Sequence, residues 1–476
     1  MLDLAIIIVY FIGMIAIGVY AYRRKKSSTQ NGFFVAGRSA STFFIIGSFC
    51  ATIIGASTTL GMAGLGYVRG LSGAWWLLAG SLGLLILGFF FARKVRSFGL
   101  YTLPELIEKQ YDSRAGFVAS ILIVVSWLAI IAAQIIAAGK ILSVMMPGMD
   151  ISILMIISAA VFTIYTVLGG QYSVIRTDFL QFGIIFVGVV VCLGLVLDRV
   201  GGTGGLHASL PSDFFSFPTS IKFEYLDLVS LLILVGATYV VGPDMYSRLF
   251  CARDEKVAKK SALSAALITI PVAFIIVVIG MGAKVLFPEI GSELAMPTVI
   301  KEILPIGATG LVVAALLAAV MSSADTCLLT TSTIFTVDVY KRAFPKMSER
   351  KVLLVSRIGV IVLGAIALVL ALELKGIINS LLLAYTVFTS GVVLPVIAGF
   401  YKDKLKVNAI GAVVAIIGGG GTALAIKQLK ITHITLFGTS IGHMELLGFV
   451  VCLVLLFGVS WITRAFSRQR SAISQE

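Results

Sequence analysis

The chain has 476 residues, of which 59% are hydrophobic and only 13% are charged, and its mean hydropathy is +1.05. A soluble domain cannot hide so much apolar surface, whereas a stack of membrane spans, each about 20 residues long, accounts for it. The formal net charge of +14 would suit a protein that binds nucleic acid, but the basic residues cluster in short connections between apolar runs. Membrane topology explains that clustering better than a phosphate-binding face does.

Apolar runs follow one another along the chain, and no segment between them is long or polar enough to form a soluble domain. The sequence therefore predicts an all-α polytopic membrane protein with about 13 transmembrane helices in a single membrane domain. The predicted spans are 3–22, 42–66, 73–92, 116–144, 151–170, 178–197, 227–248, 262–286, 306–337, 353–373, 377–400, 407–427 and 444–463.

Basic residues assign a side of the membrane to each connection, because cytoplasmic loops carry an excess of Lys and Arg. With the N-terminus outside, the inner connections and the span ends beside them hold most of the 37 Lys and Arg residues. We therefore expect a plasma (inner) membrane protein with its N-terminus outside and its C-terminus in the cytoplasm. The inner connections are then 23–41, 93–115, 171–177, 249–261, 338–352, 401–406 and the C-terminal tail.

Two spans contain residues that interrupt a helix. The second span has Gly55 within a run of small and hydroxylated residues, and the seventh has Gly242-Pro243. Such breaks free backbone carbonyls, and a membrane tolerates unwound backbone only inside protein or beside a water-filled cavity. The two spans stand five apart, which points to a transporter site at the interface of two repeats. The alternative is close packing of Gly and Ala between helices.

The ninth span places polar oxygens along one face of a helix. Ala319, Ser322, Ser323 and Thr326 recur at i, i+3, i+4 and i+7. Hydroxyl and carbonyl oxygens suit a hard cation such as Na⁺. The alternative is that these hydroxyls bond to their own backbone. Asp325 favours the ion site, because an acid within a span needs a partner or an ion.

Asp178 begins the sixth span, just after a short inner connection that contains Arg176. The alternative to a functional role is a solvated acid, or one paired with Arg176, at a helix N-terminus. Three scattered histidines, and five cysteines without ligand spacing, argue against a zinc or catalytic site. We expect neither an enzyme nor a bound cofactor, because the sequence offers no set of nucleophile, base and metal ligands.

Four segments together resemble the sodium:solute symporter family, whose members carry proline, pantothenate, sialic acid, monocarboxylates and sugars. The resemblance covers about residues 3–400. It implies ten core helices in two inverted five-helix repeats of the leucine-transporter type. The segments are Gly32–Ser39, Gly169–Gln181 with its glycine pair and Thr-Asp, Gly242–Arg248 with Ala252-Arg253-Asp254, and Ala319–Leu329.

The resemblance also divides the chain. Residues 1–41 form the first peripheral helix and an inner loop, and 401–476 form two C-terminal peripheral helices. Residues 42–170 and 171–226 make the first repeat, and residues 227–400 make the second.

The same resemblance implies the sodium ligands. They are the carbonyls of Ala51, Ile54 and Ala319, and the hydroxyls of Ser322 and Ser323. This set agrees with the residue pattern itself, in which carbonyls freed by a break face hydroxyls from another helix.

A second sodium site or an ion-release path is implied at Asp178, Asp325 and Thr326, together with Ser322. In this chain Asp325 stands where members with a second site have serine. The charge and the selectivity of that site therefore differ from the family pattern.

Solute contacts are expected at Ser57, Thr58 and Tyr239, which lie beside the two breaks. Tyr239 matches an aromatic residue that lines the pocket of the proline carrier. The acid–amide pair of the sugar carriers falls at Ser57-Thr58, so a sugar is disfavoured. Broken-helix N-termini favour anionic groups, which indicates an amino acid or a small carboxylate.

The expected function is sodium-coupled secondary active symport, which imports a small organic solute by alternating access. The expected partners are Na⁺, the solute and membrane lipid, without nucleic acid, and the sequence leaves the oligomeric state open. The main alternative is a proton-coupled carrier on the same fold, in which Asp178 and Asp325 carry the protons. A membrane sensor is less favoured, because no kinase or other signalling domain follows in the sequence.

The charge asymmetry predicts where both flanks of the chain lie. A reporter fused after residue 26 and one fused after residue 476 should both lie in the cytoplasm. The measurement compares alkaline phosphatase and green fluorescent protein fusions, which are active on opposite sides of the membrane. A periplasmic signal at either position would overturn the predicted number of spans.

Overall fold

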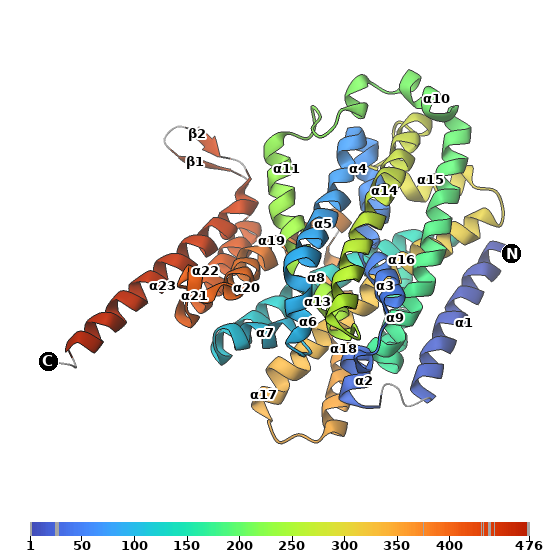
Figure 1. Ribbon diagram of the computed structural model, residues 1–476. Helices are drawn as coiled ribbons and strands as arrows, with labels where there is room; N and C mark the ends of the chain where they lie inside the picture. The colour runs from blue at the N-terminus through green and yellow to red at the C-terminus, as the bar shows by residue number, and fades with distance from the viewer. Residues whose placement is uncertain are drawn as a thin grey trace.

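The computed structural model describes residues 2–23, 28–374, 376–429, 431, 433–436, 439–441 and 443–473. The chain forms a bundle of long helices, with the short helix α10 at one end and α17 at the other (Figure 1). These ends are called the α10 end and the α17 end below. The reporter positions after residues 26 and 476 fall outside the described residues.

Helices of sufficient length and hydropathy confirm the polytopic membrane fold. Within the described residues, 11 helices are long and apolar enough to cross a membrane, and Thr42–Ile53 and Ile151–Ile164 are shorter apolar helices. Each predicted span coincides with one of these helices or with part of one. The uninterrupted helices are α1 (Leu2–Arg23), α8 (Ser113–Met145), α14 (Glu255–Leu286), α16 (Ala308–Ile334), α18 (Glu349–Glu373), α22 (Ala409–Gln428) and α23 (Leu447–Ile473).

Other spans are assembled from consecutive helical pieces. Several of these pieces are single π-helical turns, which widen the helix locally and often occur at functional sites. The pieces are α3 (Thr42–Ile53), η2 (Ser57–Gly61) and α4 (Met62–Arg69); α5 (Trp75–Ile86), η4 (Leu87–Phe91) and α6 (Ala92–Ser97); α11 (Tyr225–Leu231), η6 (Leu232–Gly236), α12 (Ala237–Val241) and α13 (Pro243–Cys251); η8 (Phe335–Tyr340) and α17 (Lys341–Ala343); and α19 (Ile377–Phe388), η9 (Thr389–Val393) and α20 (Leu394–Gly399).

Short elements connect the spans. They include one antiparallel hairpin, which departs from the all-α prediction and pairs Ile434 with Ile441. The connecting elements are α2 (Gln30–Val35), η1 (Ala36–Arg38), η3 (Gly70–Ala74), α7 (Leu103–Gln110), α10 (Gly202–Ser209), η5 (Ser212–Phe215), η7 (Ser292–Leu294), α15 (Ala295–Ile303), α21 (Lys402–Leu405), β1 (Ile434–Leu436), β2 (Thr439–Ile441) and η10 (Met444–Leu446).

The fifth and sixth predicted spans are two helices within α9 (Ile151–Val200), and they meet at Gly170, where φ is 56° and ψ is −170°. Residues 171–177 were predicted as an inner loop, but they are helical and the chain turns at Gly170 instead. Only glycine adopts that conformation readily. A Cβ there would also lie 2.6 Å from the ring of Phe33, so the bend needs glycine for space as well as for conformation.

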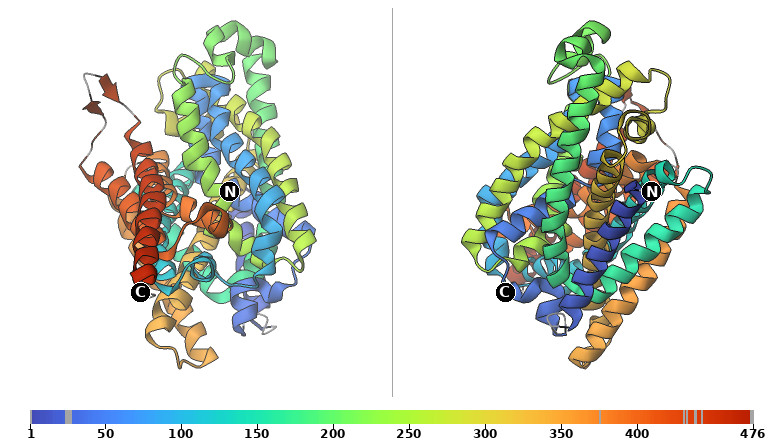
Figure 2. Two further views of the ribbon diagram at one scale, coloured as in Figure 1. Left: turned by 60° about the vertical axis from the view of Figure 1, so that its left-hand side comes forward. Right: turned by 90° about the vertical axis from the view of Figure 1, so that its right-hand side faces the viewer.

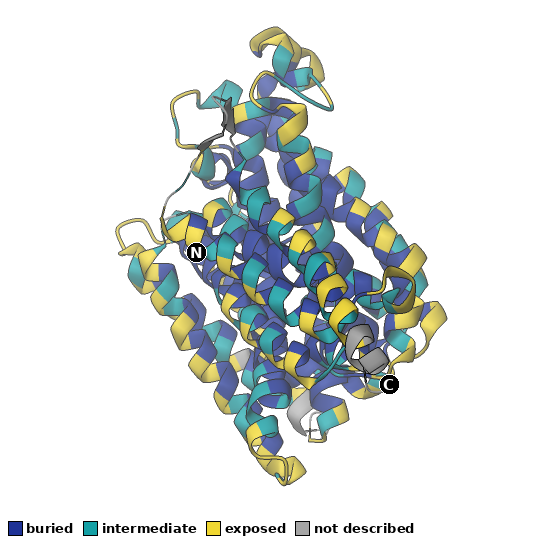
Figure 3. Ribbon diagram, turned by 90° about the vertical axis from the view of Figure 1, so that its left-hand side faces the viewer, coloured by how far each residue is buried: buried dark blue, intermediate teal, exposed yellow. Residues whose placement is uncertain are grey.

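Burial separates a central helix from the peripheral ones. In the most apolar window of each span, 94% of α16 residues are buried, against 22% in α1 and in α23. Helices α3, α8, α9 and α1 surround α16. Figure 3 shows buried residues inside the bundle and exposed ones along its flank, and Figure 2 shows α1 and α23 at the outside of the bundle. The apolar outer faces suit lipid, and the polar groups of α16 are held inside protein.

Backbone hydrogen bonds join the two spans that contain the predicted breaks, α3–α4 and α11–α13, at the α17 end. The amide of Ala40, which precedes α3, donates to the carbonyl of Cys251 at 3.2 Å, and the amide of Arg253 donates to the carbonyl of Ala40 at 3.0 Å. Arg96 Nε, at the end of α6, donates to the carbonyl of Ala252 at 2.5 Å. The α17 ends of α3, α6 and α13 therefore meet at one point.

Candidate ion and solute site

The first interrupted span is held open by side chains. Helix α3 ends at Ile53, and Ile54 has φ −84° and ψ 60°, outside the helical range. Beyond the break, the amide of Ala56 donates to Gln134 Oε1 of α8 at 3.0 Å. The hydroxyl of Thr58 donates to the carbonyl of Ile53 at 2.8 Å. Polar groups freed by the break are thus satisfied within the protein, as a lipid environment requires.

Two serine hydroxyls of α16 meet carbonyls that lie at this break. Ser322 Oγ donates to the carbonyl of Ala51 at 2.8 Å and to that of Ala319 at 2.9 Å. Ser323 Oγ donates to the carbonyl of Thr52 at 2.5 Å and to that of Ala319 at 3.2 Å. Four predicted sodium ligands therefore lie together, and the carbonyl of Thr52 joins them. The fifth predicted ligand, Ile54, is buried at the end of α3.

A glycine permits this close approach of α3 and α16. A Cβ on Gly55 would lie 2.3 Å from Ser323 Oγ. Any larger residue would therefore push α16 away from the break. The oxygens that meet here are neutral. Each hydroxyl can rotate so that its hydrogen points away from the carbonyls and its lone pairs face a cation. The arrangement provides an oxygen cage without a fixed charge, which is suited to a monovalent hard cation.

A buried ion pair lies one turn closer to the α17 end. Asp178 Oδ2 accepts from Arg248 Nη2 at 3.1 Å and from Ser48 Oγ at 2.5 Å. Both side chains of the ion pair are 0% exposed. The same Nη2 also donates to the hydroxyls of Thr52 and Thr326. Arg248 therefore links the first interrupted span, α9, α13 and α16.

The alternative pairing of Asp178 with Arg176 is wrong. The Arg176 guanidinium lies 3.6 Å from the centre of the Tyr172 ring and donates to the Tyr172 carbonyl at 3.0 Å. Residues two apart on a helix point to different faces. Asp178 therefore faces the bundle interior, where Arg248 neutralises it.

The predicted second set of ion residues is contiguous with this pair. Thr326 Oγ1 accepts from Arg248 and donates to Asp325 Oδ1 at 3.4 Å. Asp178, Asp325 and Thr326 are all 0% exposed. Arg248, which the sequence reasoning counted only among cations flanking a span, provides the positive charge of this cluster.

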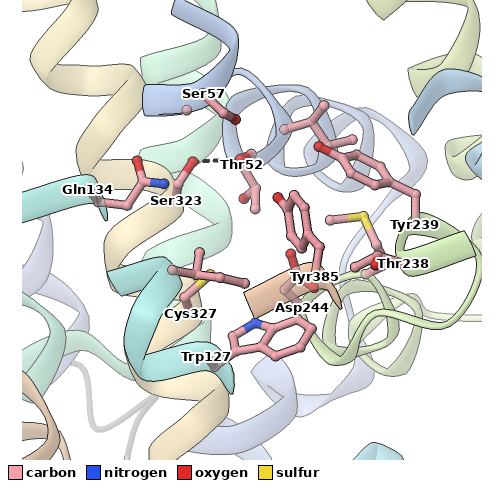
Figure 4. Close-up of a pocket in the computed structure, with 14 residues that line it drawn as sticks. Thr52, Ser57, Trp127, Gln134, Thr238, Tyr239, Asp244, Ser323, Cys327 and Tyr385 are labelled. Carbon is pink, nitrogen blue, oxygen red and sulfur yellow. Dashed lines mark hydrogen bonds between the residues drawn. The ribbon is translucent and has the colours of Figure 1, made fainter. Parts of the chain in front are cut away.

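An enclosed cavity of about 30 Å³ lies between the two breaks (Figure 4). That volume holds water but no organic solute until neighbouring groups move. Of the three predicted solute contacts, Ser57 and Tyr239 line this cavity, whereas Thr58 lies outside the lining and its hydroxyl donates to the Ile53 carbonyl. The lining residues are Thr52, Ile53, Gly55, Ser57, Trp127, Ile130, Gln134, Thr238, Tyr239, Asp244, Met245, Ser323, Cys327 and Tyr385.

Several lining residues were missed from the sequence. Gln134 and Trp127 lie within the long apolar run of α8, and Tyr385 lies in α19. Asp244 directly follows the Gly242-Pro243 break and is an acid within a span, a signal that marks functional candidates. In Figure 4, Gln134 and Ser323 lie on one side of the cavity and Tyr239 and Thr238 on the other.

A larger cavity of about 290 Å³ lies nearer the α10 end, lined among others by Arg69, Trp76, Asp227 and Thr386. Trp76 of this cavity and Tyr385 of the enclosed one are in contact, with ring centres 6.3 Å apart. The two rings therefore separate the larger cavity, called the vestibule below, from the enclosed cavity.

Comparison with known proteins identifies the family. A family model described as the sodium:solute symporter family matches residues 33–419. The chain belongs to this family. Its members are transporters and not enzymes. The described residues contain no group of three or more His, Cys, Asp or Glu placed to hold a metal ion.

Curated relatives of this chain are distant in sequence. The chain is 27% identical over 407 residues to "Sodium/glucose cotransporter 4" from Danio rerio, covering 77% of this chain and 62% of that protein. It therefore spans less than two thirds of that relative's length. It is 25% identical over 468 residues to "Sodium/glucose cotransporter" from Vibrio parahaemolyticus, covering 90% of this chain and 86% of the relative.

Solved structures confirm the leucine-transporter type of fold. A Na⁺-coupled sialic acid symporter in a substrate-bound outward-open state matches with a TM-score of 0.81 at 20% identity, over 97% of this chain and 98% of the other. Mhp1, a nucleobase-cation-symport-1 family transporter, matches with a TM-score of 0.64 at 15% identity, over 90% of this chain and 94% of Mhp1.

The buried pair predicts a large loss of stability when one partner is removed. Arg248→Gln leaves Asp178 as a buried charge without its cation and should lower the free energy of unfolding by about 3–5 kcal/mol. Arg248→Gln combined with Asp178→Asn should restore part of that loss. The measurement is denaturation of the purified protein in detergent.

The matched control is Arg253→Gln. Arg253 pairs with Asp254, but the two side chains are 63% and 48% exposed. Removing such an exposed pair should change stability by no more than about 1 kcal/mol. A double variant no more stable than Arg248→Gln alone would contradict the pairing argument.

Proposed function

We propose that this protein is a sodium-coupled secondary active symporter that imports a small organic solute, an amino acid or a small carboxylate, by alternating access. The observation that carries the proposal is the meeting of the Ser322 and Ser323 hydroxyls with the carbonyls of Ala51 and Thr52. Membership of the sodium:solute symporter family supports it.

Sodium couples to the solute through the shared helix break. The ion binds carbonyls on α3 and hydroxyls on α16, so it draws together two helices that also line the enclosed cavity at Thr52 and Ser323. A bound ion stabilises the conformation in which both helices are in place. A solute that contacts the same conformation binds more tightly, and by linkage it raises the affinity for sodium equally.

The proposed solute differs from those of the curated relatives. Relatives are named for glucose and for myo-inositol. In this chain Ser57 and Thr58 stand where the sugar carriers have an acid–amide pair, and the Thr58 hydroxyl is bonded to Ile53. The serine, threonine and tyrosine hydroxyls of the lining offer hydrogen bonds to a small polar solute.

The direction of transport follows from the charge asymmetry. With the Lys- and Arg-rich connections in the cytoplasm, the α10 end and the vestibule face outside. A solute then passes from the vestibule, between Trp76 and Tyr385, into the enclosed cavity. The Asp178–Arg248 cluster lies on the cytoplasmic side of the sodium ligands and forms the release path.

Arg248 restricts ion binding at the second set of predicted ion residues, Asp178, Asp325 and Thr326. Its guanidinium already contacts Asp178 and Thr326, the residues that would bind a second ion. An ion passing towards the cytoplasm must displace Arg248 from Asp178 or share that carboxylate with it. We therefore favour a release path over a second permanent sodium site at Asp178, Asp325 and Thr326.

Proton coupling is the second candidate function. Asp178 and Asp325 are fully buried acids beside the proposed ion route, and Oδ1 of Asp178 has no hydrogen-bond partner. Carboxylates held in a bundle interior are groups that carry protons in membrane pumps and carriers. A proton on one of them would replace sodium as the coupling ion.

Removing a serine hydroxyl should weaken sodium dependence more than solute dependence. Ser322→Ala and Ser323→Ala should each raise the Na⁺ concentration for half-maximal uptake by about 5- to 150-fold, which corresponds to about 1–3 kcal/mol. The matched control is Thr331→Ala on the same helix, whose buried hydroxyl bonds only to the Cys327 carbonyl at 2.6 Å. Unchanged sodium dependence in both serine variants would exclude these hydroxyls from the ion site.

Neutral variants of the two acids distinguish sodium from proton coupling. For sodium coupling, Asp325→Ser should alter stoichiometry or ion selectivity without abolishing transport, and Asp178→Asn should slow turnover more than it weakens solute binding. For proton coupling, wild-type protein should transport without Na⁺ under an inward proton gradient, and both variants should lose that activity. The measurement is uptake into proteoliposomes under imposed ion gradients. Wild-type sodium and pH dependence in both variants would assign the acids a structural role.

A further inference from the structure

Two polar atoms in the lining of the enclosed cavity have no hydrogen-bond partner. They are Oδ1 of Asp244, in the first turn of α13, and the Nε1–H of Trp127, on α8. The side chain of Trp127 is almost fully buried, with 1% exposed. A protein loses stability when it buries an unpaired donor or acceptor. One acceptor and one donor left unpaired around a single cavity are therefore suited to a ligand (Figure 4).

The charged residues in the lining of the enclosed cavity indicate which class of ligand can bind there. Among the described lining residues, Asp244 is the one with a formal charge, and the others are apolar or carry neutral hydroxyl, amide, thiol or indole groups. A solute that carried only a carboxylate would lie beside an acid and would find no cationic side chain in the lining. A solute with a cationic group would find its counter-charge in Asp244.

Arg248 does not supply the missing positive charge to Asp244. Its Nη1 donates to the backbone carbonyl of Asp244 at 3.3 Å, and its Nη2 pairs with the carboxylate of Asp178 at 3.1 Å. Asp178 and Asp244 thus outnumber Arg248 at this site, which favours a cation as the species that completes it.

The N-terminus of α13 already carries a negatively charged side chain, that of Asp244. A helix N-terminus attracts negative charge, and an empty one at a break would favour the carboxylate of a solute. Here Asp244 occupies that first turn, directly after Pro243. Its carboxylate takes the place of a solute anion at the helix end and presents a negative group to the cavity instead.

We propose that Asp244 and Trp127 select a solute that carries both a protonated amine and a carboxylate, that is, an amino acid in preference to a simple carboxylate. The ammonium donates to Oδ1 of Asp244, and the Nε1–H of Trp127 donates to the carboxylate. This inference rests on the proposed transport function and narrows its solute class.

The first test compares matched ligands on the wild-type protein. Thermal stabilisation of the purified full chain is titrated, in NaCl and in KCl, with the twenty amino acids, their 2-hydroxy acids and their decarboxylated amines. At least one amino acid should stabilise the protein in NaCl, and its 2-hydroxy acid should bind at least tenfold more weakly, because a charge-assisted hydrogen bond is lost. An amino acid and its 2-hydroxy acid that bind equally would overturn the inference.

The second test asks whether Asp244 binds the ammonium group of the solute and whether Trp127 binds its carboxylate. Asp244→Asn should weaken binding of the amino acid at least tenfold and leave stabilisation by Na⁺ alone unchanged. Trp127→Phe keeps an aromatic side chain next to Phe388, whose ring packs edge-on against Trp127 with centres 4.7 Å apart, and removes the N–H together with the five-membered ring that bears it. It should weaken binding of the amino acid several-fold and leave binding of the decarboxylated amine unchanged. The control is Asp338→Asn, a buried acid outside the lining of this cavity.

The outcomes separate this inference from the proposed function. Stabilisation by Na⁺ and by a sugar or a 2-hydroxy acid, with no response to amino acids, would overturn the inference and leave sodium coupling standing. No difference between NaCl and KCl for any ligand would overturn sodium coupling itself. If Asp244→Asn weakens stabilisation by Na⁺ alone, Asp244 binds the ion and the inference is wrong. If that variant does not fold, the wild-type ligand comparison and Trp127→Phe still decide.

Discussion

Unwound backbone in the middle of a membrane bundle is the constraint on which the rest of the structure depends. Lipid offers no hydrogen bonds, so every carbonyl freed at the end of α3 needs a partner from the protein or an ion. Ser322, Ser323 and Thr58 bind the carbonyls of Ala51, Thr52 and Ile53. Two of the hydroxyls that stabilise the break, those of Ser322 and Ser323, are also the proposed sodium ligands, and Gly55 leaves room for α16 to bring them there.

Buried charge imposes a second constraint, which acts at the α17 end of the site. Asp178 is tolerated in the interior because Arg248 pairs with it, and Arg248 in turn binds Thr52 beside the sodium ligands. The ion site and the charged cluster therefore share one residue of the break. Thr52 thus accepts from Arg248 with its hydroxyl and from Ser323 with its carbonyl, so a change at either contact acts on the same residue.

Features governed by the bilayer could be predicted from the sequence, and features governed by tertiary contacts could not. Hydropathy located the spans because lipid imposes one length and one polarity on all of them. Helical spacing placed Ser322 and Ser323 on one face of α16, and both hydroxyls do meet the carbonyls at the break. Arg248 was missed because an arginine at a span end has the same sequence signature whether it faces the cytoplasm or an interior acid. The turn between two helices at Gly170 was predicted as a longer loop, since sequence does not show that a single glycine suffices to redirect the chain.

The backbone bonds between Ala40, Cys251 and Arg253 restrict how the helices around the break can shift relative to one another. Together with the bond from Arg96 to Ala252, they join α3, α6 and α13 at their α17 ends. Helix α16 meets α3 through the hydroxyls of Ser322 and Ser323, and its Thr326 accepts from Arg248 of α13. The proposed sodium ligands therefore lie between the backbone of α3, which is anchored at its α17 end, and a helix joined to it by side-chain hydrogen bonds. A sodium ion bound there, as proposed, would cross-link the two helices, and its release would remove that cross-link.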